Sequence, residues 1–131
     1  MRTHLCLAVV ACLLAACTPA PQGPPPAPPT DLVALDTPPP VYPEALACDG
    51  IGGTAVLMLD IGTDGRVRQA RVARSSGNAG LDAAALEGVR SWSFRAATRN
   101  GQPVSSPLQV PMNFKPPLER PQRCFVLDEQ R

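Results

Sequence analysis

The chain has 131 residues, 17 of which are prolines, and its formal net charge is +1 at pH 7. A protein this close to neutrality has no general attraction for phosphate, so DNA and RNA are not expected partners. The only histidine is His4, which lies in a segment that we expect to be cleaved off. The remainder then has no imidazole for a catalytic triad or a zinc site. We therefore expect no metal, no cofactor and no enzyme activity.

The N-terminus has the pattern of a secretory signal. Arg2 precedes an apolar segment from Leu5 to Ala15, which is too short to span a bilayer. The segment closes in Leu14-Ala15-Ala16-Cys17, which resembles the lipobox of bacterial lipoproteins.

The lipobox resemblance implies that residues 1–16 are removed and that Cys17 is acylated, so that lipid chains tether the protein to a membrane. Thr18 stands where an Asp would retain a lipoprotein in the inner membrane, which favours the outer membrane. The alternative is an ordinary secretory signal in which Cys17 has no special role.

Residues 17–40 are rich in proline, with 10 prolines between Thr18 and Pro40. Because proline lacks the N–H donor and fixes φ, we expect neither helix nor strand in this segment. Polyproline II rises about 3.1 Å per residue, so the segment would hold a domain up to roughly 70 Å from the lipid surface. The sequence therefore predicts a spacer between the anchor and the folded domain.

We expect one small folded domain at residues 41–115. Glu44 to Ala47 is long enough for one helical turn before the glycine-rich stretch after Asp49 ends it. Thr54 to Ile61 is almost continuously apolar, which indicates a central strand.

A second strand is predicted to return from a hairpin turn at Asp64-Gly65 and to run from Val67 to Ser75. Val67 is one residue out of step with the apolar positions that follow it, so we expect a bulge near Arg68 and Gln69.

The rest of the domain is predicted to be a loop, a helix and a strand. After the loop from Ser75 to Gly80, the region from Leu81 to Trp92 has one apolar face, made of Leu81, Ala85, Val89 and Trp92. We expect Trp92 and Phe94 to anchor this helix against the sheet. After a turn at Asn100-Gly101, alternating residues predict a strand from Val104 to Phe114.

The order strand, strand, helix, strand predicts an α+β fold. A right-handed return through the helix places the last strand beside the first, which gives a three-stranded antiparallel sheet with the spatial order second, first, third. The helix packs on one face of this sheet.

Cys48 and Cys124 are expected to pair in an oxidising compartment. Such a bridge closes nearly the whole domain into one loop, which in the chain-entropy model stabilises it by about 4 to 5 kcal/mol. It would also tie back the C-terminal extension, residues 116–131, with Phe125 and Leu127 covering apolar surface. The alternative is two separate buried thiols.

Seven short motifs occur in one order along this domain, and together they resemble the TonB C-terminal domain family over about residues 40–115. They are Tyr42-Pro43, Gly53, Asp64-Gly65-Arg66-Val67, Ser75-Ser76-Gly77, Leu81-Asp82-Ala83-Ala84-Ala85-Leu86, Trp92-Ser93-Phe94 and Val110-Pro111-Met112-Asn113-Phe114. The resemblance implies a domain of the Gram-negative cell envelope that faces the periplasm and contacts outer-membrane receptors in TonB-dependent transmembrane transport. In that family, a short N-terminal receptor segment adds as a strand beside the final strand.

The strand edge that corresponds to this binding site is Leu108, Gln109, Val110, Pro111, Met112, Asn113 and Phe114. Residues of equal parity point their amide groups to the same side, so Pro107 and Pro111 place the amides of Gln109 and Asn113 at the free edge. Protection of the edge against aggregation is a second role for these prolines, compatible with the first. An open edge also permits a dimer.

Full transducers of the family keep an uncleaved N-terminal transmembrane helix that contacts a proton-driven motor, whereas this chain has a short signal with a lipobox. Receptor recognition is therefore better supported than energy coupling. The alternative function is a non-energised envelope scaffold or adaptor that binds another protein.

A basic cluster is expected on the second strand, made of Arg66, Arg68, Arg71 and Arg74. Most clusters of this kind are solvated surfaces. The specific alternative is a contact with acidic receptor segments or lipid headgroups.

Overall fold

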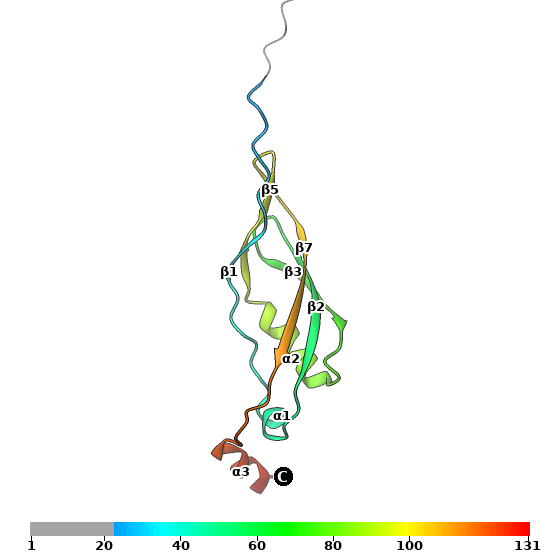
Figure 1. The fold of residues 1–131 in the computed structure, drawn as a ribbon, viewed down its shortest axis with the longest axis vertical. Coiled ribbons are helices and arrows are strands. Elements are labelled where there is room, and N and C mark those ends of the chain that lie inside the picture. Colours follow the sequence, from blue (N-terminus) through cyan, green and yellow to red (C-terminus); the bar gives the residue numbers. More distant parts are fainter. Residues whose placement is uncertain (1–22) are drawn as a thin grey trace, which may run out of the picture.

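The computed structural model describes residues 23–131 (Figure 1). Its centre is a three-stranded antiparallel sheet of β2 (Gly53–Ile61), β3 (Val67–Arg74) and β7 (Ser106–Phe114). The strands lie in the order β3-β2-β7, so β2 is central. The α+β fold and the strand order predicted from the sequence are confirmed.

Helix α2 (Ala79–Val89) covers one face of this sheet. The side-chain oxygen of Asn78 caps the helix, because it accepts hydrogen bonds from the backbone N–H groups of Gly80 and Leu81 at 2.8 and 3.2 Å. The sequence predicts that the helix reaches Trp92, but it ends three residues earlier, because the chain turns there and enters strand β4 (Ser93–Arg95). With its 11 residues α2 is the longest helix between residues 23 and 131, and no helix in that range is long and apolar enough to cross a membrane.

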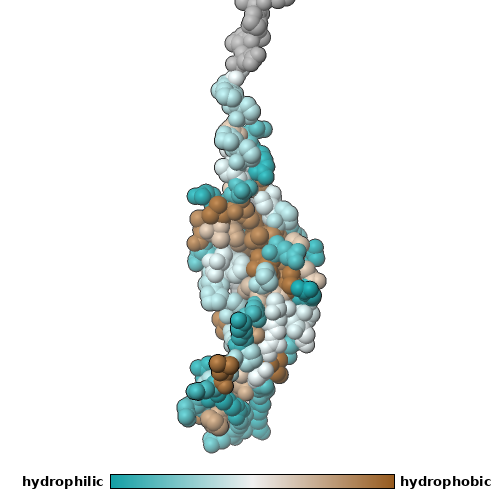
Figure 2. All heavy atoms as spheres, in the orientation of Figure 1, coloured by the Kyte–Doolittle hydropathy of each residue, from teal (hydrophilic) through white to brown (hydrophobic). Residues whose placement is uncertain are grey.

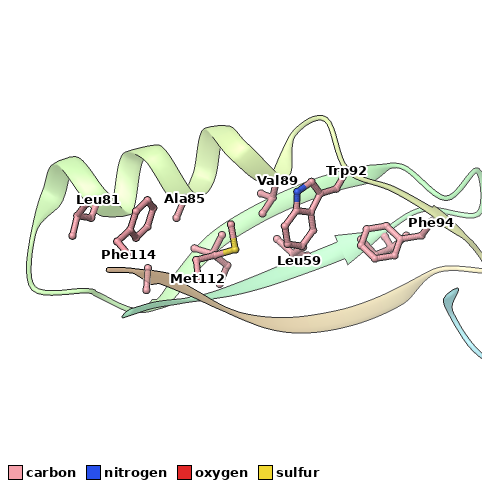
Figure 3. Close-up of a cluster of buried hydrophobic side chains, with 11 residues drawn as sticks. Leu59, Leu81, Ala85, Val89, Trp92, Phe94, Met112 and Phe114 are labelled. Carbon is pink, nitrogen blue, oxygen red and sulfur yellow. The ribbon is translucent and has the colours of Figure 1, made fainter. Parts of the chain in front are cut away.

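The hydrophobic core lies between α2 and the sheet (Figure 3). The helix contributes Leu81, Ala85 and Val89, and the strands contribute alternate residues such as Leu59 and Met112. Trp92 and Phe94 extend the core past the end of the helix, with ring centroids 6.3 Å apart. Both aromatic side chains are buried, so their expected role as anchors is confirmed.

Strand β3 contains two bulges. Gln69 lies opposite Asp60 and Val67 opposite Ile61, which leaves Arg68 as the extra residue at the predicted position. A second, unexpected bulge leaves Ala73 unpaired between Val72 and Arg74. The strand therefore twists strongly at both ends.

The β2–β3 hairpin turns at Gly65, which has a φ of +76°. A Cβ atom at this position would lie 1.8 Å from the carbonyl oxygen of Phe94. That same residue donates its N–H to the Gly65 carbonyl at 2.9 Å. Only glycine therefore fits, and the hairpin end is joined to β4.

Part of the proline-rich segment folds onto the domain. We call residues 30–40 the N-terminal arm; it contains β1 (Val33–Asp36), which pairs antiparallel with β4. The expectation that residues 17–40 contain no strand is wrong here, because the stretch from Asp31 to Thr37 has no proline and its backbone donors are free to pair.

The arm is fastened at three further places. Thr30 and Thr98 exchange two backbone hydrogen bonds of 3.1 and 3.2 Å. The indole N–H of Trp92 donates to the carbonyl of Pro38 at 2.8 Å. Pro40 packs against Gly88, where a Cβ atom would lie 2.8 Å from the proline ring. The arm therefore runs along the length of the domain on the side of α2.

The connection from β4 to β7 contains a small hairpin that the sequence predicts only by its turn. Strands β5 (Ala97–Arg99) and β6 (Gln102–Val104) flank Asn100-Gly101, both of which have positive φ. The last strand, predicted from Val104, is divided into β6 and β7 because Ser105 lies between them unpaired.

Two short helices meet at the opposite end of the molecule (Figure 1). They are α1 (Glu44–Cys48) and α3 (Gln122–Glu129), and a disulfide joins Cys48 to Cys124 with the Cα atoms 5.4 Å apart. Ion pairs link Arg123 to Glu44 and Arg131 to Asp49.

The C-terminal extension covers less apolar surface than expected. Leu127 is half-buried, but Phe125 is 52% exposed, so the expectation for Phe125 is wrong. The guanidinium of Arg120 lies over its ring at 5.4 Å instead. In Figure 2 hydrophobic atoms gather on the upper part of the visible face and in smaller groups near α3, and the exposed apolar residues include Leu35 of β1 and Val126 of α3.

Candidate functional site

The three-stranded sheet has two edge strands, β3 and β7, and they differ in regularity. β7 pairs with β2 through nine consecutive residue pairs without a register shift. β3 pairs with the same strand through two bulges and carries several exposed arginines. Bulges and charges are the usual means of preventing strand pairing at an edge. The edge of β7 is therefore the better of the two for accepting a further strand.

The register shows which backbone groups of β7 are free. Pro107 lies opposite Asp60 and Pro111 opposite Val56. Neither proline has an N–H group, so these positions form the non-hydrogen-bonded pairs of the ladder. The amides of Gln109 and Asn113 alternate with them in the same parity and point toward the open edge.

The side chains of β7 divide between the two faces of the sheet. Met112 and Phe114 are buried beneath α2, while Leu108 and Val110 are half-buried on the same face. Gln109 and the other odd-numbered residues of the strand are exposed on the opposite face. An added strand would therefore contact half-buried apolar side chains on the face that α2 covers and polar side chains on the opposite face.

The four arginines predicted as one basic cluster do not gather in one place. Arg68 is the bulge residue of β3 and forms an ion pair with Asp64 at 3.1 Å. Arg66 lies at the hairpin end, where its backbone forms an isolated antiparallel β-bridge with Ser93. Arg71 and Arg74 lie opposite Met58 and Val56 on the face away from α2. The bulge at Arg68 takes that residue out of the alternation of side chains, whereas the bulge at Ala73 brings Arg74 onto the same face as Arg71.

Ser75, Ser76 and Asp82 form a hydrogen-bonded cluster at the start of α2, and its role is structural. The hydroxyl of Ser75 donates a short hydrogen bond to Asp82, and the backbone N–H and the hydroxyl of Ser76 donate to the same carboxylate. The Ser75 bond is the main cause of a lowered pKa of Asp82, which partial desolvation opposes. The arrangement fixes the loop before the helix and gives no activated nucleophile.

Between residues 23 and 131, no three His, Cys, Asp or Glu side chains are grouped in a way that could hold a metal ion. Cys17, the predicted lipidation site, lies outside the described residues.

The sequence does not predict the N-terminal arm or its partners on the domain. Thr30 and Trp92 make the hydrogen bonds that fasten it, yet neither residue type signals such a contact. The only available signal was the proline-free stretch between Asp31 and Thr37.

Comparisons with known proteins agree with this architecture. Residues 38–116 match the family model described as Gram-negative bacterial TonB protein C-terminal. A Protein TonB of Xanthomonas campestris pv. campestris is 39% identical over 84 residues, which cover 64% of this chain and 38% of that protein. Protein tonB2 of Pseudomonas aeruginosa is 35% identical over 81 residues, which cover 62% of this chain and 30% of that protein. The chain thus spans less than two fifths of the length of these relatives.

A solved structure shows the same fold. The solution NMR structure of the Pseudomonas aeruginosa TonB CTD superposes with a TM-score of 0.59 at 26% sequence identity. The match covers 70% of this chain and 91% of that domain.

Proposed function

Because this chain belongs to the TonB C-terminal family, we propose that it is a lipid-anchored, periplasm-facing module that engages outer-membrane transport receptors by strand addition. Proteins of this family serve energy transduction or binding and are not enzymes. The family is one of the Gram-negative cell envelope, and its members interact with outer-membrane receptors. What goes beyond the family is the lipid anchor at Cys17 and the strand edge used.

The observation that carries the proposal is the open edge of β7. It is regular over nine residue pairs, and nothing between residues 23 and 131 pairs with its outer side. A receptor segment in extended form would accept hydrogen bonds from the amides of Gln109 and Asn113 and donate to the carbonyls between them. Each such bond contributes about 0.5–1.5 kcal/mol net.

Pro107 and Pro111 limit the affinity, because they remove two of the four donors at this edge. An edge of this kind favours a moderate, reversible contact and also resists pairing between copies. We therefore propose that the prolines serve both purposes. No coupling to a proton-driven motor is included in the proposal.

A scaffold or adaptor lipoprotein that binds another envelope protein is the second candidate. The observation that favours it is the C-terminal extension, which begins where the family match ends at residue 116. Its helix α3 is held by a disulfide but leaves Phe125 and Val126 about half exposed. A partner that recognised these side chains would not be a receptor segment on β7.

The test is an NMR titration of the oxidised chain from Thr18 onward with N-terminal segments of outer-membrane receptors from the same cell. Strand addition predicts saturable shifts concentrated from Leu108 to Phe114. Shifts confined to α3 would instead favour the scaffold, and a lack of shifts at Gln109 and Asn113 on binding would refute the edge.

A pair of substitutions at one position separates backbone from side-chain recognition. Gln109→Pro removes the outward donor without changing a bond to β2, so it should weaken binding roughly two- to twelvefold. Gln109→Ala keeps the donor and should bind as the unchanged protein does. Equal losses in both variants would mean that the side chain, and not the backbone, is recognised.

A further inference from the structure

The face of the sheet opposite α2 is a separate surface, which we call the open face. Register places residues from all three strands on it, and all the following are exposed: Thr54, Asp60, Gln69, Arg71, Arg74, Pro107, Gln109, Pro111 and Asn113. Helix α2 packs on the other face. Val56 and Met58 of the central strand lie on the same face, where Val56 is buried and Met58 is half-buried. Within residues 23–131 the exposed residues of the open face are therefore mainly polar, and no helix packs on it.

The charges of the open face are unbalanced, although the chain as a whole is nearly neutral. Arg71 and Arg74 form no ion pair with any residue from 23 to 131. In the same range Arg68, Arg90, Arg120, Arg123 and Arg131 each pair with a carboxylate, whereas Arg66, Arg95 and Arg99, which lie outside the open face, also form no ion pair. Asp60 is the one carboxylate among the open-face residues defined above. The face therefore presents two guanidinium groups without an ion-pair partner and a single carboxylate.

The two arginines stand in rows that cross the sheet. Arg71, Met58 and Gln109 form one row, and Arg74, Val56 and Pro111 form another. Neighbouring strands are about 4.8 Å apart, so the arginine of each row lies roughly 10 Å from the β7 residue of the same row. The outer side of β7 is the edge of the sheet. A polypeptide lying across the strands would reach both the arginines and this end of the sheet.

We propose that the open face binds an acidic polypeptide segment whose carboxylates pair with Arg71 and Arg74. Guanidinium groups bind carboxylates through two parallel hydrogen bonds, which gives direction as well as charge. The amide side chains of Gln69, Gln109 and Asn113 supply neutral hydrogen-bonding groups beside them.

A polypeptide fits this face better than a lipid surface does. A membrane contact of useful strength combines basic residues with inserted apolar side chains. The large apolar side chains that are exposed, such as Leu35, Leu118 and Phe125, belong to β1 and the C-terminal extension and not to the open face. The proposal concerns the face and not the edge of β7, so it stands or fails independently of receptor strand addition.

The test uses the oxidised chain from Thr18 onward, labelled for NMR, and a short peptide of alternating Glu and Ser at low salt. Its Gln-Ser counterpart is the uncharged control. We expect the acidic peptide alone to shift the signals of Arg71 and Arg74, and added salt to weaken its binding.

The variant Arg71→Gln/Arg74→Gln should lose roughly twofold to thirtyfold in affinity, as expected for two exposed ion pairs. Arg90→Gln/Arg95→Gln is the control for the change in net charge, because it removes the same charge from the C-terminal end of α2, where Arg90 pairs with Glu87, and from β4. Thermal unfolding of both variants checks that the fold is kept.

Three outcomes would overturn the proposal. The first is no binding of the acidic peptide, and the second is equal weakening by the two double variants. The third is binding of phosphatidylglycerol vesicles through Arg71 and Arg74 when the acidic peptide does not bind, which would assign the face to a membrane.

Discussion

Reduction of the Cys48–Cys124 disulfide should lower the global stability of the domain by a large and calculable amount. The bridge joins residues 76 positions apart and encloses the whole three-stranded sheet. In the chain-entropy model, a loop of this length restricts the unfolded chain enough to contribute about 4.5 kcal/mol at 25 °C. The corresponding loss in melting temperature is roughly 20–35 °C for a domain of about 100 residues.

Native contacts of α3 add little to the stability that the disulfide contributes. Cys124 is the one buried residue of the helix, and its ion pairs are exposed to solvent, where each contributes about 0–1 kcal/mol. After reduction we therefore expect α3 to detach at a lower denaturant concentration than the sheet unfolds.

Urea unfolding of the same chain with and without reductant measures the difference. The single tryptophan, Trp92, is buried in the core, so its fluorescence reports global unfolding. The variant Cys48→Ala/Cys124→Ala serves as control, because reductant should not change its stability. A difference below about 1 kcal/mol between the oxidised and reduced chains would refute the loop-entropy reasoning.

Two further changes test the loop before α2 and the N-terminal arm. Asp82 has a lowered pKa in the folded protein, so its contribution to stability is present above the unfolded value of 3.8 and is lost as the pH falls through the lower folded value. Asp82→Asn should remove this part of the acid dependence, as followed by unfolding at pH values from neutral to acid; an unchanged acid profile would contradict the assignment. Trp92→Phe removes the hydrogen bond to the Pro38 carbonyl and should cost about 0.5–1.5 kcal/mol. It should also speed hydrogen exchange and proteolysis in the arm, and equal protection of residues 30–40 in both proteins would show that this bond does not hold the arm.

The parts of the fold that could be predicted have a local signal. The apolar run from Thr54 to Ile61 and the face formed by Leu81, Ala85 and Val89 depend on residues close in sequence, and both appear as predicted. The bulge at Arg68 could be predicted because it puts Val67 one residue out of step with the apolar positions that follow it. The second bulge at Ala73 leaves no such mark, because the strand ends at the next residue, Arg74, and no apolar residue follows to show a change of parity.

The parts that were missed depend on distant partners. All four residues of β1 are exposed, so the strand has no alternation of buried and exposed positions that a pattern could reveal. Its existence depends on pairing with β4, a three-residue strand that lies more than 50 positions away. The division of the basic cluster was likewise invisible, because it follows from bulge positions and from the ion pair of Arg68 with Asp64.

The docked arm also determines which end of the domain is connected to the N-terminal segment. Figure 1 shows the chain entering beside the β5–β6 hairpin and ending at α3, at the opposite end of the long axis. If Cys17 carries lipid, only residues 18–29 lie between the anchor and the first contact at Thr30, and even fully extended they span about 45 Å. The β5–β6 end is then the tethered end of the domain, and β7 runs from this end toward α3 (Figure 1). The Ser106 end of β7 therefore stays within reach of a partner in the anchoring membrane, whereas the disulfide-linked helices lie at the end of the domain farthest from the tether.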